Sequence, residues 1–131
     1  MIRHEKGQSI VEMALLFPLL LMLLMGVVDL GRAYYVIVSL RDAADEGAAY
    51  AAIEPMKDND IRLRAADATG ELVVVDPANV SIDKPLLQAG APITVTIEYH
   101  YDFYMPLVTP LLPEEGITLR GQASHPILRV N

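Results

Sequence analysis

Hydrophobic side chains are concentrated in one run near the start of the chain, the sixteen residues from Met13 to Val28. Ile10 and Val11 extend this run, and Glu12 is the only charged side chain that interrupts it. A helix of about 20 apolar residues crosses the hydrocarbon core of a bilayer. A slightly shorter helix is accommodated by small changes in tilt or bilayer thickness. The pattern therefore predicts one membrane-spanning helix over about residues 10–28.

The helix is predicted to continue beyond this run to Ile53. Apolar residues recur there at steps of three and four, charged residues avoid that stripe, and Pro55 ends the helix. An unbroken helix from Gln8 to Ile53 would be roughly 65–70 Å long at ~1.5 Å per residue. Its second half also contains a patch of small residues that permits close approach of another helix or a sheet. The stripe comprises Leu30, Ala33, Tyr34, Ile37, Leu40, Ala44, Ala48 and Ala51, and the patch comprises Ala43, Ala44, Gly47, Ala48, Ala51 and Ala52.

A second, shorter helix is expected from Asp58 or Asp60 to about Leu72. Asp58, Asn59 and Asp60 offer side-chain oxygens that can cap its first turn. The apolar stripe of this helix is thin and comprises Ile61, Ala65, Ala68 and Leu72.

Alternation of apolar and polar residues predicts strands in the last third of the chain. The clearest strand is Ile93–Phe103, whose odd-numbered residues are apolar and whose even-numbered residues are polar. Such alternation indicates one packed face and one solvated face. Ile117–Ile127 repeats the pattern more weakly, Val80–Ile82 predicts a short strand, and Asp76–Asn79 predicts a turn. A small antiparallel sheet against the long helix gives an α+β fold.

Composition excludes several function classes. The formal net charge is −7 and the ten Lys and Arg residues are scattered, which argues against nucleic-acid binding. The chain has no cysteine, so disulfides and thiolate metal sites are excluded. It contains no nucleophile elbow, phosphate-binding loop or paired Cys/His motif, so we expect no enzyme activity, cofactor or small-molecule substrate. His100, between Glu98 and Asp102 on the polar strand face, would suit a weak metal site, but a solvated face is the favoured interpretation.

The residues before the apolar run form a short polar head that contains Arg3 and Lys6 and ends at Gly7. Positive charge before a span favours a cytoplasmic N-terminus, with the residues after Val28 outside the membrane. A cleaved signal peptide is disfavoured because no clear A-x-A pattern follows the run. A plain single-span anchor accounts for the run alone. It leaves Gly7 and Glu12 unexplained.

Gly7–Pro18, followed by Asp29–Tyr34, resembles the opening of the TadE/TadG-like pseudopilins, which are related to type IV pilins. Ala43–Ala52 is similar to the small-residue helix that follows in these proteins. Residues 93–101 and 116–123 resemble the closing strands of the family, whereas residues 54–91 match only loosely.

The resemblance implies that a prepilin peptidase cuts after Gly7, so that the mature chain begins at Gln8. The expected parts are a leader at 1–7, the long helix at 8–53, and a small extracytoplasmic pilin-like domain at 54–131. Family members are minor, pilin-like components of the Tad (Flp) pilus and secretion machinery. The implied partners are the membrane, the peptidase, and other pilin-like subunits or further copies in a filament. The alternative is a single-pass envelope protein whose outer domain binds another envelope partner.

Two residues within the span are candidate assembly residues. A carboxylate at the centre of an inserted helix costs roughly 2.5–3.5 kcal/mol, so Glu12, near the start of the helix, is expected to find a partner on a neighbouring subunit. Pro18 removes one backbone hydrogen bond and clashes with the carbonyl of residue 14. It predicts either an ordinary kink or a point at which the helix unwinds during filament assembly.

The connection between the last two predicted strands, Tyr104–Gly116, is long and apolar. The favoured interpretation is that its hydrophobic side chains fill the small core. The alternative is a contact surface for a neighbouring subunit or for the outer surface of the membrane.

Overall fold

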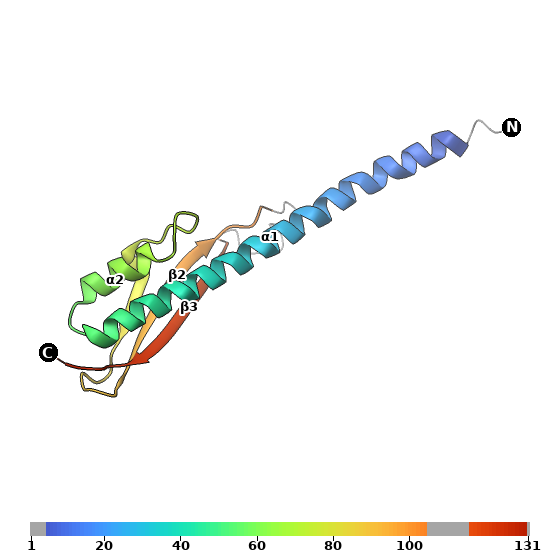
Figure 1. Ribbon diagram of the computed structural model, residues 1–131. Helices are drawn as coiled ribbons and strands as arrows, with labels where there is room; N and C mark the ends of the chain where they lie inside the picture. The colour runs from blue at the N-terminus through green and yellow to red at the C-terminus, as the bar shows by residue number, and fades with distance from the viewer. Residues whose placement is uncertain (1–4, 105–115, 131) are drawn as a thin grey trace. The chain divides into compact units, whose positions relative to one another are not determined.

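The computed structural model describes residues 5–104 and 116–130 of the chain, with their side chains from Gly7 onward. A helix of 49 residues, α1 (Glu5–Ile53), is followed by α2 (Asp58–Asp67) and a 3-10 turn (Pro77–Asn79). Three strands complete the described part of the chain: β1 (Val80–Asp83), β2 (Pro92–Tyr101) and β3 (Ile117–Pro126) (Figure 1). The predicted α+β fold is confirmed.

The chain divides into two compact units, and α1 contributes to both. One unit comprises residues 1–32 with 102–116, and the other comprises residues 33–101 with 117–131. We call them the N-terminal unit and the sheet unit. The boundaries expected from the sequence at residues 7 and 53 concern processing and export, and they stay predictions.

The sheet unit contains one antiparallel sheet in the order β1-β2-β3. Ile97 of β2 lies opposite Val80 of β1 and Gly121 of β3. Alternation along β2 is as predicted, with one buried face that comprises Ile93, Val95, Ile97 and Tyr101. The strand ends at Tyr101 and not at Phe103, because Tyr101 is paired with the first residue of β3 and the ladder stops there.

The core of the sheet unit lies where α1 crosses the sheet, and it depends on small residues. A Cβ built on Gly121 of β3 would lie 2.3 Å from the backbone carbonyl of Leu40. A Cβ on Gly47 would lie 2.8 Å from Cβ of Ala65 in α2. The predicted small-residue patch is therefore confirmed as a close-packing surface, and every member is buried. The predicted continuation of the helix to Ile53 is confirmed. Its stripe is buried from Leu40 onward, whereas Leu30 and Tyr34 are 69% and 71% exposed.

Helix α2 is shorter than predicted, and the predicted side-chain cap of its first turn is not formed. It ends at Asp67 and not near Leu72, because the chain turns through Thr69 and through Gly70, whose φ is +81°. Leu72 and Ala68 are consequently exposed, and Ile61, Ala65 and Ala66 form the buried face. The residue before the helix is Lys57 and no side chain caps the first turn. Asp58 instead forms an ion pair with Lys84.

Candidate functional site

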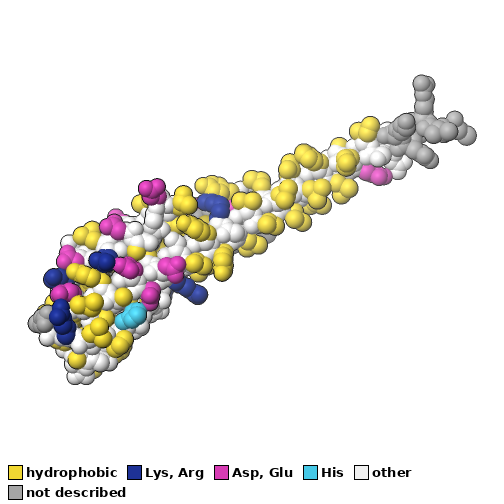
Figure 2. All heavy atoms as spheres, in the orientation of Figure 1, with side chains coloured by type: hydrophobic (Ala, Val, Ile, Leu, Met, Phe, Trp, Pro, Cys, Tyr) yellow, Lys and Arg dark blue, Asp and Glu magenta, His cyan; other side chains and the backbone are white. Residues whose placement is uncertain are grey.

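The N-terminal part of α1 presents hydrophobic side chains to its surroundings on every side. Met13 is 70% exposed, Leu15 73% and Leu23 60%. An 18-residue stretch has a mean hydropathy of 2.5, and none of it is buried. Among the described residues, α1 is the one helix long and apolar enough to cross a membrane, by length and composition alone. Figure 2 shows hydrophobic side chains along the N-terminal part of α1, where few charged side chains are seen.

The predicted processing residues, Gly7 and Gln8, lie in the first turns of α1 together with Glu12. No atom lies within 4 Å of a Cβ built on Gly7, so its surroundings are open. The side-chain amide of Gln8 donates a hydrogen bond of 3.2 Å to Oε1 of Glu12, one helical turn further along. Gln8 and Glu12 are exposed. The structure thus brings two of the predicted residues together and leaves both accessible.

Pro18 lies inside α1, and the chain is helical on both sides of it. Its neighbours Phe17 and Leu19 are 60% and 59% exposed. Proline has no backbone N–H, so one hydrogen bond of the helix is missing at this point. Its role in assembly stays a prediction.

A buried carboxylate at the end of the apolar run is the feature that the sequence reasoning missed. Asp29 is only 3% exposed, and its Oδ2 accepts a hydrogen bond of 2.9 Å from the backbone N–H of Tyr104. Its Oδ1 lies 3.4 Å from Nη1 of Arg32, whose guanidinium stands 4.1 Å from the centre of the Tyr104 ring. The sequence signal for this buried carboxylate was that Asp29 directly follows sixteen apolar residues. Its partner is 75 positions away in sequence.

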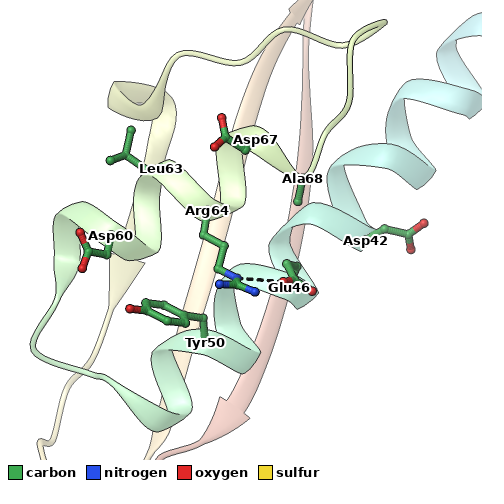
Figure 3. Close-up of a pocket in the computed structure, with 8 residues that line it drawn as sticks. All are labelled: Asp42, Glu46, Tyr50, Asp60, Leu63, Arg64, Asp67 and Ala68. Atoms are coloured by element: carbon green, nitrogen blue, oxygen red, sulfur yellow. Dashed lines mark hydrogen bonds and ion pairs between the residues drawn. The ribbon is translucent and has the colours of Figure 1, made fainter.

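A groove of the sheet unit lies between α1 and α2 (Figure 3). Arg64 of α2 points into it, donates a hydrogen bond of 2.9 Å to Glu46, and lies 5.1 Å from the Tyr50 ring. Both members of this ion pair are about half exposed, so it is worth ~1 kcal/mol or less. The other charged lining residues are carboxylates, namely Asp42, Asp60 and Asp67. This groove therefore lies between two helices and is lined by one arginine and four carboxylates.

The strand face that offered the weak metal site carries an ion pair instead, in which Glu98 accepts from Arg120 on the neighbouring strand at 2.5 Å. On the opposite face of the sheet, His125, which is paired with the buried Ile93, lies 2.8 Å from Asp45 of α1. Within the described ranges 5–104 and 116–130, no three His, Cys, Asp or Glu side chains are grouped to hold a metal ion.

The predicted contact or core-filling segment, Tyr104–Gly116, lies outside the described residues except for its two ends. The head that contains Arg3 and Lys6 is likewise not described at the level of side chains. Both expectations stay predictions.

Residues 7–49 match the model of the family described as TadE-like protein. The matched segment contains Gly7, Gln8, Glu12 and Pro18, and continues through Asp29 into the small-residue patch. The resemblance seen in the sequence is confirmed over these residues. No curated protein and no solved structure was found to match the chain.

Proposed function

We propose that this chain, which is TadE-like over residues 7–49, is a minor pseudopilin of a Tad (Flp) pilus or secretion system. It acts as a structural component and not as an enzyme. Its N-terminal helix holds it in the membrane and packs against the helices of other pilin-like subunits during assembly. The sheet unit lies on the extracytoplasmic side.

One observation carries this proposal: the TadE-like match includes the stretch of α1 whose apolar side chains are exposed in the described part of the chain. Burial of apolar surface contributes roughly 25 cal/mol per Å², so an uncovered apolar helix of this length is strongly unfavourable in water. A lipid bilayer covers it before assembly. Neighbouring helices cover it in a filament.

Processing after Gly7 follows from the same proposal. A glycine lets a protease approach the backbone closely because it has no Cβ, and the surroundings of Gly7 are open. Cleavage frees the amine of Gln8 and releases the basic head. Glu12 then lies one turn from the new N-terminus, where it can meet the amine of an adjacent subunit in a medium of low dielectric constant.

The test is co-expression of the full chain with a prepilin peptidase, followed by mass spectrometry of the purified protein. We expect an N-terminus at Gln8. The matched control is Gly7→Val, which should stay uncut yet remain inserted, since a side chain at this position meets no atom within 4 Å. Recovery of the intact N-terminus from the unsubstituted chain, with the peptidase active on a known substrate, would contradict the proposal.

The second candidate is a single-pass envelope protein whose outer part binds another envelope component. The apolar length of α1 is what favours it, because the same segment suffices for a plain anchor. This candidate predicts no cleavage and no dependence of complex formation on Glu12. The processing experiment therefore separates the two.

A further inference from the structure

We propose that Tyr104, held in place by Asp29 and Arg32, is a second contact of this protein with the lipid surface. It would lie at the membrane–water interface, beside the point at which α1 leaves the bilayer. This inference rests on the proposed membrane span of α1. It adds a contact made by a residue far from the span in sequence.

The first step of the argument is the burial of Asp29. An acidic side chain on an isolated helix next to sixteen apolar residues would face lipid or headgroups, at a cost that normally requires a partner. Here the carboxylate accepts from the Tyr104 N–H at 2.9 Å and pairs with Arg32 at 3.4 Å. The contact therefore satisfies Asp29 and fixes the backbone of Tyr104 against α1.

The second step concerns the ring of Tyr104. The guanidinium of Arg32 stands 4.1 Å from the ring centre, a cation–π distance. The side chain is nevertheless 66% exposed. An aromatic ring with an apolar body, a polar hydroxyl and a cation on one face has the chemistry that favours the interfacial layer of a bilayer.

The third step is that the Tyr104 ring lies beside the end of the apolar run of α1. Together they line a hollow whose surface is almost wholly apolar, formed by the last two turns of the run, by Asp29 and by the ring. A lipid bilayer is the partner that fits, because it supplies acyl chains to the hollow and headgroups to the polar hydroxyl and to Arg32. The residues that line the hollow are Leu21, Leu24, Met25, Val28, Asp29 and Tyr104.

The experiment uses the absence of tryptophan from the chain. Tyr104→Trp places a single indole at the site in the full protein, reconstituted in vesicles of phosphatidylethanolamine and phosphatidylglycerol. Lipids brominated close to the headgroup should quench its fluorescence more than lipids brominated near the end of the acyl chain. Phe17→Trp, in the middle of the apolar run, should show the opposite order.

The role of Asp29 is tested by adding Asp29→Ala to the Tyr104→Trp protein. Losing a hydrogen bond to a charged group should lower the docked fraction about tenfold, so quenching by the shallow lipid falls and quenching by aqueous acrylamide rises. The matched control is Asp42→Ala, which removes an exposed carboxylate from the same helix and should change neither signal.

Three results contradict the proposal in distinguishable ways. If the indole from Phe17→Trp is quenched by the deep lipid but that from Tyr104→Trp by neither lipid, the interfacial contact is absent while the membrane span stands. If neither indole is quenched, the span itself is wrong. Quenching of the Tyr104→Trp indole that Asp29→Ala leaves unchanged would refute the role of Asp29.

Discussion

Glu12 is the single charged side chain within an exposed apolar surface, and in the isolated chain its described partner is the amide of Gln8 at 3.2 Å. A neutral amide compensates a carboxylate only weakly once water is removed, whereas a cation compensates it well. Glu12 is also close to the N-terminus of a helix, where the macrodipole favours negative charge by ~0.3–1 kcal/mol. These features make it tolerable at the membrane surface and leave it available to another subunit.

We therefore expect Glu12→Val to stay inserted and to be cleaved normally, but to be incorporated poorly into pili or complexes with pilin-like partners. The substitution makes the helix more apolar, so insertion cannot suffer, while the group that sets the register between subunits is lost. Co-purification with the partners measures the effect, and N-terminal mass measures the cleavage. Wild-type levels of incorporation would show that Glu12 has no part in assembly.

The absence of a Cβ at Gly121 allows β3 to pack closely against α1 in the core of the sheet unit. An added Cβ would lie 2.3 Å from both C and O of Leu40 and 2.6 Å from its Cβ. Backbone atoms cannot rotate away as the end of a side chain can, so helix and sheet would have to separate. Leu40 is itself completely buried, and its packing would be lost with that movement.

Gly121→Ala should accordingly lower the free energy of unfolding of the sheet unit by about 3 kcal/mol, at the upper end of the cost of overpacking. Urea unfolding of the detergent-solubilised chain, followed by circular dichroism, is the measurement. Gly31→Ala is the control, because a Cβ there meets no atom within 4 Å and alanine is the better helix former by ~1 kcal/mol. Equal midpoints for the two variants would contradict this account of the core.

At the scale of elements, the short turn after α2 joins that helix to α1 by a hydrogen bond. Thr69 is 3% exposed, and its hydroxyl lies 2.7 Å from the carbonyl oxygen of Ala66 and 2.5 Å from that of Val73. The hydroxyl has one proton, so it donates to one of them at a time. Its own carbonyl accepts from Ser39 of α1 at 2.8 Å. Through this residue the end of α2 is joined both to its own last turn and to the long helix.

Thr69→Val keeps the shape of the side chain but leaves buried carbonyls without the hydroxyl donor. We expect a loss of about 1–3 kcal/mol in the free energy of unfolding, read from the same urea midpoints. Thr118→Val, on the exposed face of β3, is the matched control and should stay within ~0.5 kcal/mol of the parent. A destabilisation no larger than that of the control would mean that the turn does not hold α2.

The sequence predicted which helices and strands form more accurately than the residues at which they end. Strict alternation identified β2, because a strand with one solvated face must alternate. The end of α2 was missed because a thin apolar stripe continues formally to Leu72, whereas the hydrogen bonds of Thr69 and the positive φ of Gly70 stop the helix earlier. Hydrogen bonds from a side chain to the backbone, such as these, are not encoded in the spacing of apolar residues.

At the scale of the whole molecule, Arg3 and Lys6 before the span predict the direction of the chain across the membrane. Because positive charge favours the cytoplasmic side, we expect the residues after Val28 to lie outside. The chain has no cysteine, so single cysteines can report the side directly.

Gln122→Cys, on the exposed face of β3, should react with a membrane-impermeant maleimide in intact spheroplasts. Ser9→Cys should react only after the membrane is permeabilised with detergent. The readout is a mass shift of the labelled protein on a gel. Labelling with the two sites reversed would refute the orientation.

The sequence by itself determined the apolar helix, its small-residue patch, the strands and the candidate residues Gly7, Gln8, Glu12 and Pro18. These follow from local pattern, because hydrophobic runs, periodicity and motif spacing are properties of neighbouring residues. Only the tertiary structure decided that Asp29 is buried against Tyr104, and that Gly121 and Gly47 are the points of closest approach in the core. The residues of these contacts are far apart in sequence: Asp29 and Tyr104 by 75 positions, Leu40 and Gly121 by 81, and Gly47 and Ala65 by 18. Whether such residues meet depends on how the helices and strands pack, and not on the neighbours of each residue in the chain.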